Sequence, residues 1–501
     1  MTSGVNDRFD FTAPVPPVAE LGPVHFIAIG GSGMSGVARM FLAAGVAVSG
    51  SDARDSRVLH ELETAGATVT VGQRAANLPA DAQTVVISSA IRENNPELVA
   101  ARQRGLRVLH RAQGIAALLP GRSAVAVAGA NGKTTTSAML TVALQRAGAD
   151  PAYVLGSPLT SPDGHGASAA PGAGPFVIEA DESDGSFLAY HPETVVVTNI
   201  KPDHLDFYGD LATIEATFAR FAATIAPGGL LVAAADDPGA ARLADAHQSA
   251  GGAVVTFGTD ERADVRLSEL RPDAMTSTAL VTWQRDVPGR GGVGVVAGTR
   301  RTLTVPMPGA HNLANAAAAL VAATAGLGQD LDASLAGLAS YPGTHRRFEL
   351  VGEACGVRVV DDYAHNPDKV AALVRAGRGL VDAGGGRLVV VFQPHLYSRT
   401  RDFAAEFARG LSAADVVVLL DVYAAREDPI EGISGATIAD RVTGPEVHYL
   451  RDRDVVVPTV ADLVTTGDLV LMVGAGDITE LGPQLVATLA ERGVRVKREA
   501  P

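Results

Sequence analysis

Cysteine is almost absent from this sequence, since Cys355 is the only one among 501 residues. A single thiol cannot form a disulfide within the chain. It also excludes structural zinc sites built from four cysteines or from two cysteines and two histidines.

Long apolar runs are also missing. No stretch of about 18 uninterrupted apolar residues occurs, so the sequence predicts no membrane-spanning helix. The first residues, Met1 to Arg8, lack the basic start and apolar core of a signal peptide. We therefore expect a cytoplasmic protein without a membrane partner.

Basic residues are fewer than acidic residues in this chain. Lys and Arg total 41 against 55 for Asp and Glu, a formal net charge of −14. Bulk electrostatics of this sign argue against a nucleic-acid partner. Anionic ligands, if the chain binds them, must meet locally positive sites.

The length and the 47% hydrophobic content suffice for about three domains. Apolar strand-like runs alternate with helical patterns in three successive blocks, which predicts an α/β fold with parallel sheets. Short Val/Thr-rich pieces between residues 265 and 305 predict a small antiparallel patch, and the Ser/Pro/Gly-rich stretch from Gly156 to Pro175 predicts an exposed loop. The predicted boundaries are a flexible N-terminal arm over residues 1–20 and domains over 21–122, 123–343 and 344–501.

The first glycine turn, Gly31-Ser-Gly-Met-Ser-Gly36, follows a predicted strand. Glycines of this spacing let the backbone approach a diphosphate at a helix N-terminus, and Asp52, some twenty residues on, is placed to contact a ribose hydroxyl. A NAD-dependent dehydrogenase has this pattern, as does any domain that holds a nucleotide diphosphate. A turn that only packs a helix on a strand remains a third interpretation.

The second glycine turn, Gly129-Ala-Asn-Gly132-Lys133-Thr134-Thr135, also lies between an apolar strand and a helix. Its amides and the helix dipole favour an anion, Lys133 would reach nucleotide phosphates, and the Thr134 hydroxyl would face Mg²⁺. The loop is shorter than the general pattern, because Val127 stands where the first glycine belongs. A chance Gly-Lys-Thr is the alternative.

Two polar segments follow later strands. Glu179-Ala-Asp-Glu-Ser-Asp184 offers carboxylates of the kind that hold Mg²⁺, and His204 in Asp203-His-Leu-Asp206 is a candidate ligand for a second divalent ion. Taken singly, such residues are often solvated strand ends or structural histidines. After a phosphate loop, their combination favours phosphoryl transfer.

From Val24 to the C-terminus the chain resembles the Mur ligase family, and most closely its alanine-adding branch. The resemblance rests on the two glycine turns, the Glu179 and His204 segments, and several further motifs: Ser49-Gly-Ser-Asp52, Ser88-Ser-Ala90, His311-Asn-Leu-Ala-Asn315, Arg346-Arg-Phe348, Asp361-Asp-Tyr-Ala-His365, Phe392-Gln-Pro-His395 and Ser398-Arg-Thr-Arg401.

The resemblance implies a Rossmann-like N-terminal domain for the UDP-sugar, a P-loop central ATPase domain, and a Rossmann-like C-terminal domain for the amino acid. It implies catalytic roles for Lys133, Glu179, His204 and His365, and metal ligation by Thr134, Glu179 and His204. The implied ATP site comprises Gly129, Ala130, Asn131, Gly132, Lys133, Thr134 and Thr135, with Asn312 at the adenine, Arg347 at the phosphates and Asp362 at the ribose. The implied UDP-sugar site comprises Gly31, Ser32, Gly33, Met34, Ser35, Ser51, Asp52, Ser88, Ser89 and Ala90. Tyr363, His365 and Arg399 are implied to lie near the amino acid.

The sequence departs from the family pattern at four places. Ala130 and Asn131 replace the usual Thr-His of the loop, Asn366 stands where a second His often follows His365, and Leu396 occupies a position where many relatives carry Arg. Backbone amides carry most of the loop's function, so ATP binding should survive. The absence of Lys from residues 216–222 predicts no carbamylated lysine.

The activity implied is ATP-dependent ligation of L-alanine to the lactyl carboxylate of UDP-N-acetylmuramate through an acyl phosphate, as a step of peptidoglycan biosynthesis. ATP and two Mg²⁺ ions, replaceable by Mn²⁺, are the implied cofactors, and the chain is expected to be a monomer or weak homodimer. The alternatives are a ligase that joins a recycled peptide to the same sugar, a non-catalytic nucleotide sensor, and a dehydrogenase. A dehydrogenase leaves the phosphate loop and the C-terminal block without a role.

Overall fold

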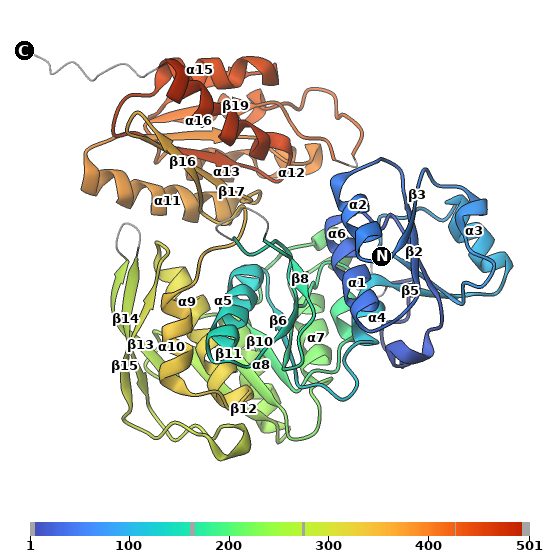
Figure 1. Cartoon of the computed structure of the whole chain (residues 1–501). Helices are drawn as coiled ribbons and strands as arrows, with labels where there is room; N and C mark the ends of the chain where they lie inside the picture. Colours follow the sequence, from blue (N-terminus) through green and yellow to red (C-terminus); the bar gives the residue numbers. More distant parts are fainter. Residues whose placement is uncertain (1–5, 161–165, 273–275, 426, 493–501) are drawn as a thin grey trace, which may run out of the picture. The chain divides into compact units, whose positions relative to one another are not determined.

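The computed structural model describes residues 6–160, 166–272, 276–425 and 427–492. It divides into two compact units, described separately here (Figure 1). The first unit runs to Arg271 and includes Ser277–Pro306 and Ala310–Pro342. The second contains Pro272–Thr276, Met307–Gly309 and the chain from Gly343 onward.

The first sheet of unit one is wholly parallel, with strand order β3-β2-β1-β4-β5. The strand order reverses between β1 and β4, and in open α/β sheets ligands bind beyond the carboxyl ends of the strands at such a point. Its strands are β1 (Val24–Ile27), β2 (Val48–Asp52), β3 (Thr68–Val71), β4 (Thr84–Ile87) and β5 (Arg107–His110), and its helices are α1 (Ser32–Ala43), α2 (Arg57–Thr64), α3 (Pro96–Gln103) and α4 (Arg111–Ala116).

The expected flexible arm is described only from residue 6 onward, and that part lies against the first sheet. Phe9 and Phe11 pack their rings on His110, and Phe11 is buried. The Gln113 amide also donates a hydrogen bond to the Asp10 carbonyl. Two aromatic residues within a proline-rich stretch thus supply the apolar contact that holds this segment.

The second sheet of unit one has ten strands in the order β15-β14-β13-β12-β11-β10-β6-β9-β7-β8. Its centre is parallel, whereas β14 with β15 and β7 with β8 are antiparallel. The expected antiparallel patch therefore continues the main sheet. The strands are β6 (Ala124–Ala128), β7 (Ala152–Val154), β8 (Ala169–Ala170), β9 (Phe176–Glu179), β10 (Thr194–Val197), β11 (Leu230–Ala234), β12 (Ala253–Gly258), β13 (Val265–Pro272), β14 (Ser277–Trp283) and β15 (Arg300–Val305).

Helix α5 (Lys133–Arg146) is the central helix of this part of the chain. It packs against both α9 (Ala310–Val321) and α10 (Leu331–Ala339), and its residues from Thr134 to Leu144 are all buried. A helix buried this completely fixes the direction of its N-terminus, which is where the phosphate loop ends. The remaining helices are α6 (Leu205–Tyr208), α7 (Leu211–Ala222), α8 (Pro238–Ser249) and a π-helical turn over Ala322–Gly326.

The stretch expected as an exposed loop after Gly156 is partly structured. Within its described residues, β8 pairs with β7, and Ala169 is buried. This short strand also packs against α1, so it joins the two sheets of unit one. The prediction of an exposed loop was wrong for β8, because small residues were read as solvent-facing where they serve a close contact.

Unit two contains one sheet, ordered β16-β17-β21-β18-β19-β20, which is parallel except at β16. Apolar clusters cover both of its faces. The strands are β16 (Glu349–Ala354), β17 (Val357–Asp362), β18 (Leu388–Phe392), β19 (Val416–Leu420), β20 (Glu446–Leu450) and β21 (Leu469–Val473). The helices are α11 (Pro367–Gly384), α12 (Tyr397–Asp402), α13 (Ala404–Leu411), α14 (Ala436–Ala439), α15 (Val456–Leu463) and α16 (Leu481–Arg492).

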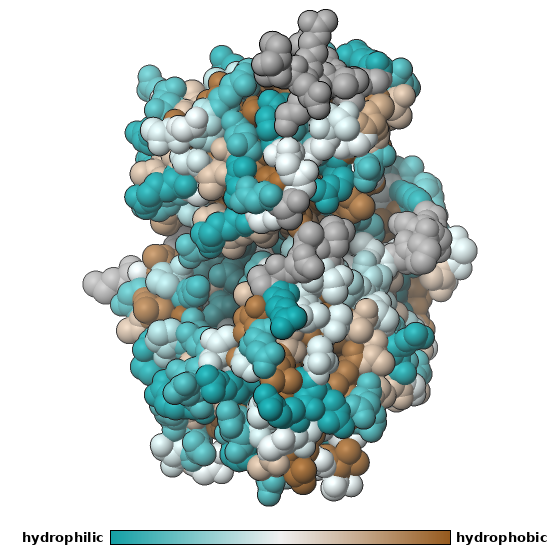
Figure 2. Space-filling view, turned by 90° about the vertical axis from the view of Figure 1, so that its left-hand side faces the viewer, coloured by the Kyte–Doolittle hydropathy of each residue, from teal (hydrophilic) through white to brown (hydrophobic). Residues whose placement is uncertain are grey.

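Among the described residues, none of the helices combines the length and apolar character needed to cross a membrane. On the face displayed in Figure 2, polar and apolar residues are interspersed.

Candidate active site

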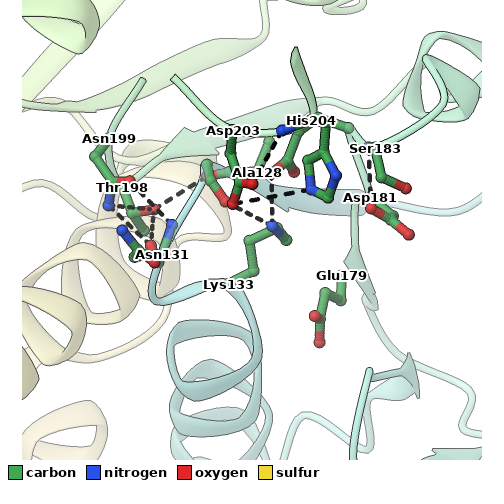
Figure 3. A network of polar contacts seen from close by, with 12 residues as sticks. Ala128, Asn131, Lys133, Glu179, Asp181, Ser183, Thr198, Asn199, Asp203 and His204 are labelled. Atoms are coloured by element: carbon green, nitrogen blue, oxygen red, sulfur yellow. Dashed lines mark hydrogen bonds and ion pairs between the residues drawn. The ribbon is translucent and has the colours of Figure 1, made fainter. Parts of the chain in front are cut away.

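The phosphate loop joins β6 to α5, and neighbouring segments hold its backbone. The Asn131 amide donates to Oδ1 of Asn199 at 2.9 Å, while the Asn199 side-chain amide and the Thr198 hydroxyl donate to the Asn131 carbonyl at 2.8 and 2.6 Å. Figure 3 shows this cluster around Asn131. The loop is thus fixed through its main chain, and the Asn131 side chain is not needed for its shape.

Two glycines of this loop have backbone conformations that favour glycine. Gly129 has φ 133° and Gly132 has φ 89°. A β-carbon on either would also lie closer than 3.0 Å to a side-chain oxygen, of Thr198 and Asn315 respectively. Gly132 directly precedes α5. Because it has no side chain, the chain turns tightly there and the first amides of the helix stay open for an anion.

Lys133 begins α5, and its amine donates to the Gly129 carbonyl at 2.7 Å and to Glu182 at 2.8 Å. Burial opposes the charge on Lys133, but Glu182, Asp181 and Glu179 outweigh it and raise the pKa of the amine. Glu182 is buried, its Oε2 has no hydrogen-bond partner among the described residues, and this burial raises the pKa of its carboxyl despite Lys133. The lysine is therefore charged and held beside the loop.

Thr134 and Glu179 form an oxygen-rich pair at the carboxyl ends of β6 and β9. The Thr134 hydroxyl donates to Oε1 of Glu179 at 2.8 Å, and Oε2 of Glu179 accepts the Gly156 amide at 2.6 Å. Hydroxyl and carboxylate oxygens are the donors that Mg²⁺ prefers, so these two residues fit that ion.

His204 has the left-handed conformation, with φ 53°, and its imidazole lies within 4.0 Å of Asp203. In Figure 3 the Glu179 carboxylate points away from the His204 ring. Within the described part of the chain, no group of three His, Cys, Asp or Glu side chains could by itself hold a metal ion.

The first glycine turn links β1 to α1, and different neighbours crowd each of its glycines. A β-carbon on Gly33 would collide with the guanidinium of Arg111, and one on Gly36 would lie 2.8 Å from Cβ of Ala169 in β8. The carboxylate of Asp52 accepts the Gly30 amide at 3.0 Å. Asp52 therefore closes the turn, at the strand end where a ribose contact was expected.

Several residues expected at the UDP-sugar lie inside the sheet or its edges. Ser51 is fully buried, and its hydroxyl donates to the buried Glu97 at 2.6 Å, so its side chain is engaged inside the domain. Met34 and Ser35 are buried as well, whereas Ser89 and Ala90 are exposed and Gly31, Gly33 and Ser88 are partly exposed. The side chain of Ser32 is outside what the structure describes.

Ser89 joins the two sheets of unit one. Its hydroxyl lies 3.1 Å from Nε2 of His110 and 2.5 Å from the carboxylate of Asp184, which ends the acidic segment after β9. Burial lowers the pKa of His110 to about 4, and its Nδ1 accepts the Ala112 amide, so the ring is neutral with its proton on Nε2. This arrangement is a hydrogen-bonded connection and lacks the geometry of a nucleophilic triad, because the imidazole Nδ1 faces an amide.

In unit two, Tyr363, His365 and Arg399 lie together beyond the carboxyl ends of β17 and β18. The Tyr363 and His365 rings are 5.0 Å apart, and Arg399 donates to the His365 carbonyl at 3.4 Å. Nδ1 of His365 lies 2.8 Å from the Tyr363 carbonyl and so carries the proton, which leaves Nε2 as an acceptor. Burial, with Lys369 nearby, lowers the pKa of His365 to about 3.

Asp362 and Arg347 lie in the same region of unit two. Asp362 accepts the amides of Phe348 and Ala364, both at 2.8 Å, and burial outweighs the attraction of Arg347 and raises its pKa. The Arg347 guanidinium lies 5.1 Å from the centre of the Tyr363 ring. Asp362 thus orders the segment that carries Tyr363 and His365.

Comparison with known proteins gives matches along nearly the whole chain. Residues 23–122 match the Mur ligase family catalytic domain, residues 127–323 the Mur ligase middle domain, and residues 346–476 the Mur ligase glutamate ligase domain. The chain belongs to the Mur ligase family.

Individual relatives of this Mur ligase agree with that assignment. The UDP-N-acetylmuramate–L-alanine ligase of Kineococcus radiotolerans is 54% identical over 96% of this chain and 99% of its own length. The crystal structure of a UDP-N-acetylmuramate-alanine ligase from Thermotoga maritima is 29% identical, covers 94% of this chain and 99% of its own, and superimposes with a TM-score of 0.76. A murein peptide ligase from Psychrobacter arcticus, at 22% identity, a TM-score of 0.65 and coverage of 95% and 100%, shares the fold.

Several residues at the active site of this Mur ligase were not predicted from its sequence, because they act through the backbone or through other side chains. Thr198 and Asn199 hold the loop, Asn315 lies against Gly132, and Glu182 pairs with Lys133. Glu182 stands inside the acidic segment already singled out, and Asn199 follows the end of β10, so strand-end position gave a signal for both. Asn315 ends the motif that begins at His311, but nothing in that motif indicated that it reaches the phosphate loop from α9. Asn312, in the same helix, is buried and accepts from Asn315 at 3.3 Å.

Proposed function

We propose that this Mur ligase joins L-alanine to the lactyl carboxylate of UDP-N-acetylmuramate at the expense of ATP, as a step of peptidoglycan biosynthesis. The observation that carries the proposal is the phosphate loop, where a charged lysine and an oxygen pair suited to Mg²⁺ meet at the carboxyl ends of β6 and β9. The choice of substrates is supported by a ligase of this specificity that is 54% identical over 96% of this chain.

The reaction needs activation, because a carboxylate does not form an amide with an amine at neutral pH. In the first step a carboxylate oxygen attacks the γ-phosphorus of ATP, the bond to the β–γ bridging oxygen breaks, and an acyl phosphate and ADP result. In the second step the alanine ammonium loses one proton to solvent, and the resulting amine nitrogen attacks the acyl carbon. The carbon–oxygen bond to phosphate then breaks, and the second proton of the nitrogen goes to the leaving phosphate. The products are UDP-N-acetylmuramoyl-L-alanine, ADP and inorganic phosphate.

Lys133 stabilises negative charge on the transferred phosphoryl group in this proposal. Its amine is bonded to Glu182 and the Gly129 carbonyl, so a phosphate oxygen would exchange with one of these acceptors. The loop residues Gly129, Ala130, Asn131, Gly132 and Thr135 would surround the phosphates, and the amides of Ala130 and Asn131 are already bonded to Asn199. Asn312 would lie at the adenine, and Arg347 and Asp362 at the phosphates and ribose.

Thr134 and Glu179 would hold Mg²⁺, since both offer oxygen donors at hydrogen-bond distance from one another. When bound, the ion supplies positive charge against the phosphate oxygens. His204 is proposed as the protein ligand of a second ion, and Mn²⁺ could replace either.

Unit two would hold the amino acid. The neutral Nε2 of His365 can accept a hydrogen bond from the alanine ammonium, and its lowered pKa favours binding of the amine over removal of its proton. Arg399 offers a cation for the alanine carboxylate, and Tyr363 borders both. Leu396 cannot supply the carboxylate contact that an arginine gives there in many relatives.

For the UDP-sugar, we propose the backbone of the turn from Gly31 to Ser35, including Ser32 and Met34, with Asp52 and the main chain of Ser51 beside it. Ser88, Ser89 and Ala90 follow β4, which pairs with β1 on the side opposite β2. We place the enzyme in the cytoplasm, where its nucleotide substrates occur, as a monomer or weak homodimer.

Release of inorganic phosphate from ATP and Mg²⁺ tests this function, with UDP-N-acetylmuramate and L-alanine each added or omitted. We expect phosphate only when both are present, together with a product heavier by one alanine residue. Release with a cell-wall tripeptide but not with alanine would move the assignment to a recycling ligase. Nucleotide binding without phosphate release under any of these conditions would indicate a sensor.

A further inference from the structure

Arg111 lies against the first glycine turn and has no assigned role. It is the first residue of α4, and a β-carbon on Gly33 would lie 3.1 Å from Cζ and 3.3 Å from Cδ of its side chain, with Nη1 closer still. The arginine is partly buried. None of the described residues accepts a hydrogen bond from it or forms an ion pair with it.

The guanidinium of Arg111 keeps its donors for a ligand. It has five N–H donors, and none of its nitrogen atoms is among the described side-chain atoms that are buried without a partner, so solvent reaches them. The stem and the head of the side chain both lie along the backbone of Gly33, which limits the side from which a partner can approach. A partner that brings acceptor oxygens to this place would replace water at these donors.

Charges of both signs surround Arg111. Together with Lys133 and the Ser183 amide it lowers the pKa of Asp181, in the acidic segment after β9, against the effect of burial. The adjacent His110 is neutral, since burial lowers its pKa to about 4. Arg111 is therefore the side chain that brings positive charge to the turn.

The main chain of the turn offers donors beside that charge. The amides of Met34 and Ser35 donate to the Gly31 carbonyl, whereas among the described acceptors none takes the amide of Gly33. This amide lies in the first turn of a helix of 12 residues. An anion at this point would receive backbone hydrogen bonds and the guanidinium together.

We propose that Arg111 binds substrate directly, by pairing its guanidinium with the diphosphate of the UDP-sugar on the Gly31–Gly36 turn. The proposal rests on the function proposed above and adds to it the residue that supplies the charge in a chain with a net charge of −14. It also explains Gly33, because any side chain there would push the guanidinium off the backbone.

Calorimetry with UDP and UMP tests the contact, because these ligands differ by one phosphate. The variants are Arg111→Met and Arg111→Lys. The matched control is Arg107→Met, an arginine of the same domain that lies at the opposite, amino end of β5 beside Thr84. We expect Arg111→Met to weaken UDP binding about tenfold or more, with a much smaller effect on UMP and none on the KM for ATP. Arg111→Lys should recover part of the loss, and Arg107→Met should bind as the wild type does.

Unchanged UDP binding in Arg111→Met, or equal losses for UDP and UMP, would overturn the proposal. So would a loss seen with UDP-N-acetylmuramate but not with UDP, because the guanidinium would then meet the lactyl carboxylate. Thermal unfolding checks each variant, and if Arg111→Met does not fold, Arg111→Lys against Arg107→Lys gives the same comparison. Wild-type protein that binds UDP but ligates nothing would refute the proposed function and leave the contact standing.

Discussion

The two glycine turns of unit one look alike in sequence, but their glycines are required for different reasons. In the phosphate loop, Gly129 and Gly132 have φ values of 133° and 89°, which L side chains rarely adopt. In the first turn, Gly31 has φ −60°, and neither Gly33 nor Gly36 has positive φ. There the requirement is space, for Arg111 and for Ala169. One residue type thus serves a backbone conformation in one site and a close approach in the other.

A buried glutamate lies near each turn, Glu97 near the first and Glu182 near the second. The pKa values of the two carboxyls are shifted in opposite directions. Glu97 is buried, which opposes its charge, yet His25, Ser51, Asn77 and the Arg74 amide all donate to it and lower its pKa. Glu182 has Lys133 as its donor and one oxygen without a partner among the described residues, so burial prevails and raises its pKa. The first glutamate is a satisfied structural anion, while the second is held beside a group that must exchange partners.

The largest expected effect is at the phosphate loop. Lys133→Ala should lower kcat about a hundredfold or more, since it removes the charge that meets the phosphoryl group. Glu182→Gln is the matched variant, because it breaks the same ion pair and keeps the amine. Phosphate release under saturating substrates measures both. Near-normal turnover of Lys133→Ala would refute the role of the loop, and an equal loss in Glu182→Gln would assign the effect to the pair.

The next largest effect is expected at Glu97, the buried anion of the first domain. Glu97→Gln replaces one acceptor oxygen by a donor and should lower the free energy of unfolding by about 3 kcal/mol at pH 7, as measured by urea denaturation. Glu182→Gln should cost less stability, because its carboxyl is poorly satisfied. The exposed Glu63→Gln is the control.

The stability difference between the wild type and Glu97→Gln should depend on pH, and the direction of this dependence follows from the pKa of Glu97. The pKa of Glu97 is lowered in the folded protein, so the ionised carboxyl stabilises the fold fully above its ordinary value of 4.5. That stabilisation is lost as the pH falls through the lower, folded value. The gap between wild type and Glu97→Gln should therefore shrink below pH 4.5, and a gap that widens there would contradict the assignment.

Alanine substitutions at the glycines separate conformation from space. Gly132→Ala should cost about 1–2 kcal/mol from its φ alone, and the added Asn315→Ala should not restore the loss, since it only removes the collision. Gly33→Ala collides with Arg111 at an allowed φ, so the added Arg111→Ala should restore most of the stability. Thermal unfolding of the four variants gives the answer. Full recovery in Gly132→Ala/Asn315→Ala would show that space matters in both turns.

The smallest effect is expected where the two sheets of unit one meet. Gly36→Ala brings a methyl group to 2.8 Å from Cβ of Ala169 and should destabilise this contact by about 1 kcal/mol. The added Ala169→Gly should restore the unfolding midpoint, because it removes the opposing methyl. Failure to restore it would mean that Gly36 has another role.

Much of the fold could be predicted from local patterns. The strand predicted before each glycine turn and the helix predicted after the second turn were confirmed, since apolar runs that end in glycine turns specify them over a few residues. The structure has them at Val24–Ile27, Ala124–Ala128 and Lys133–Arg146. The short strand β3 was missed, because its Thr-Val alternation covers only four residues, most of which are exposed.

The sequence by itself determined the alternation of strands and helices, the two glycine turns, and the kinds of chemistry that follow each strand, because turn residues and hydrophobic periodicity act over short distances. Only the tertiary structure decided that Ser51 faces Glu97, that Asn199 holds the phosphate loop, and that Arg111 and Ala169 occupy the space left by two glycines. Each of these contacts joins segments that lie far apart in the chain. Their positions depend on how the strands are ordered and packed, which no local pattern encodes.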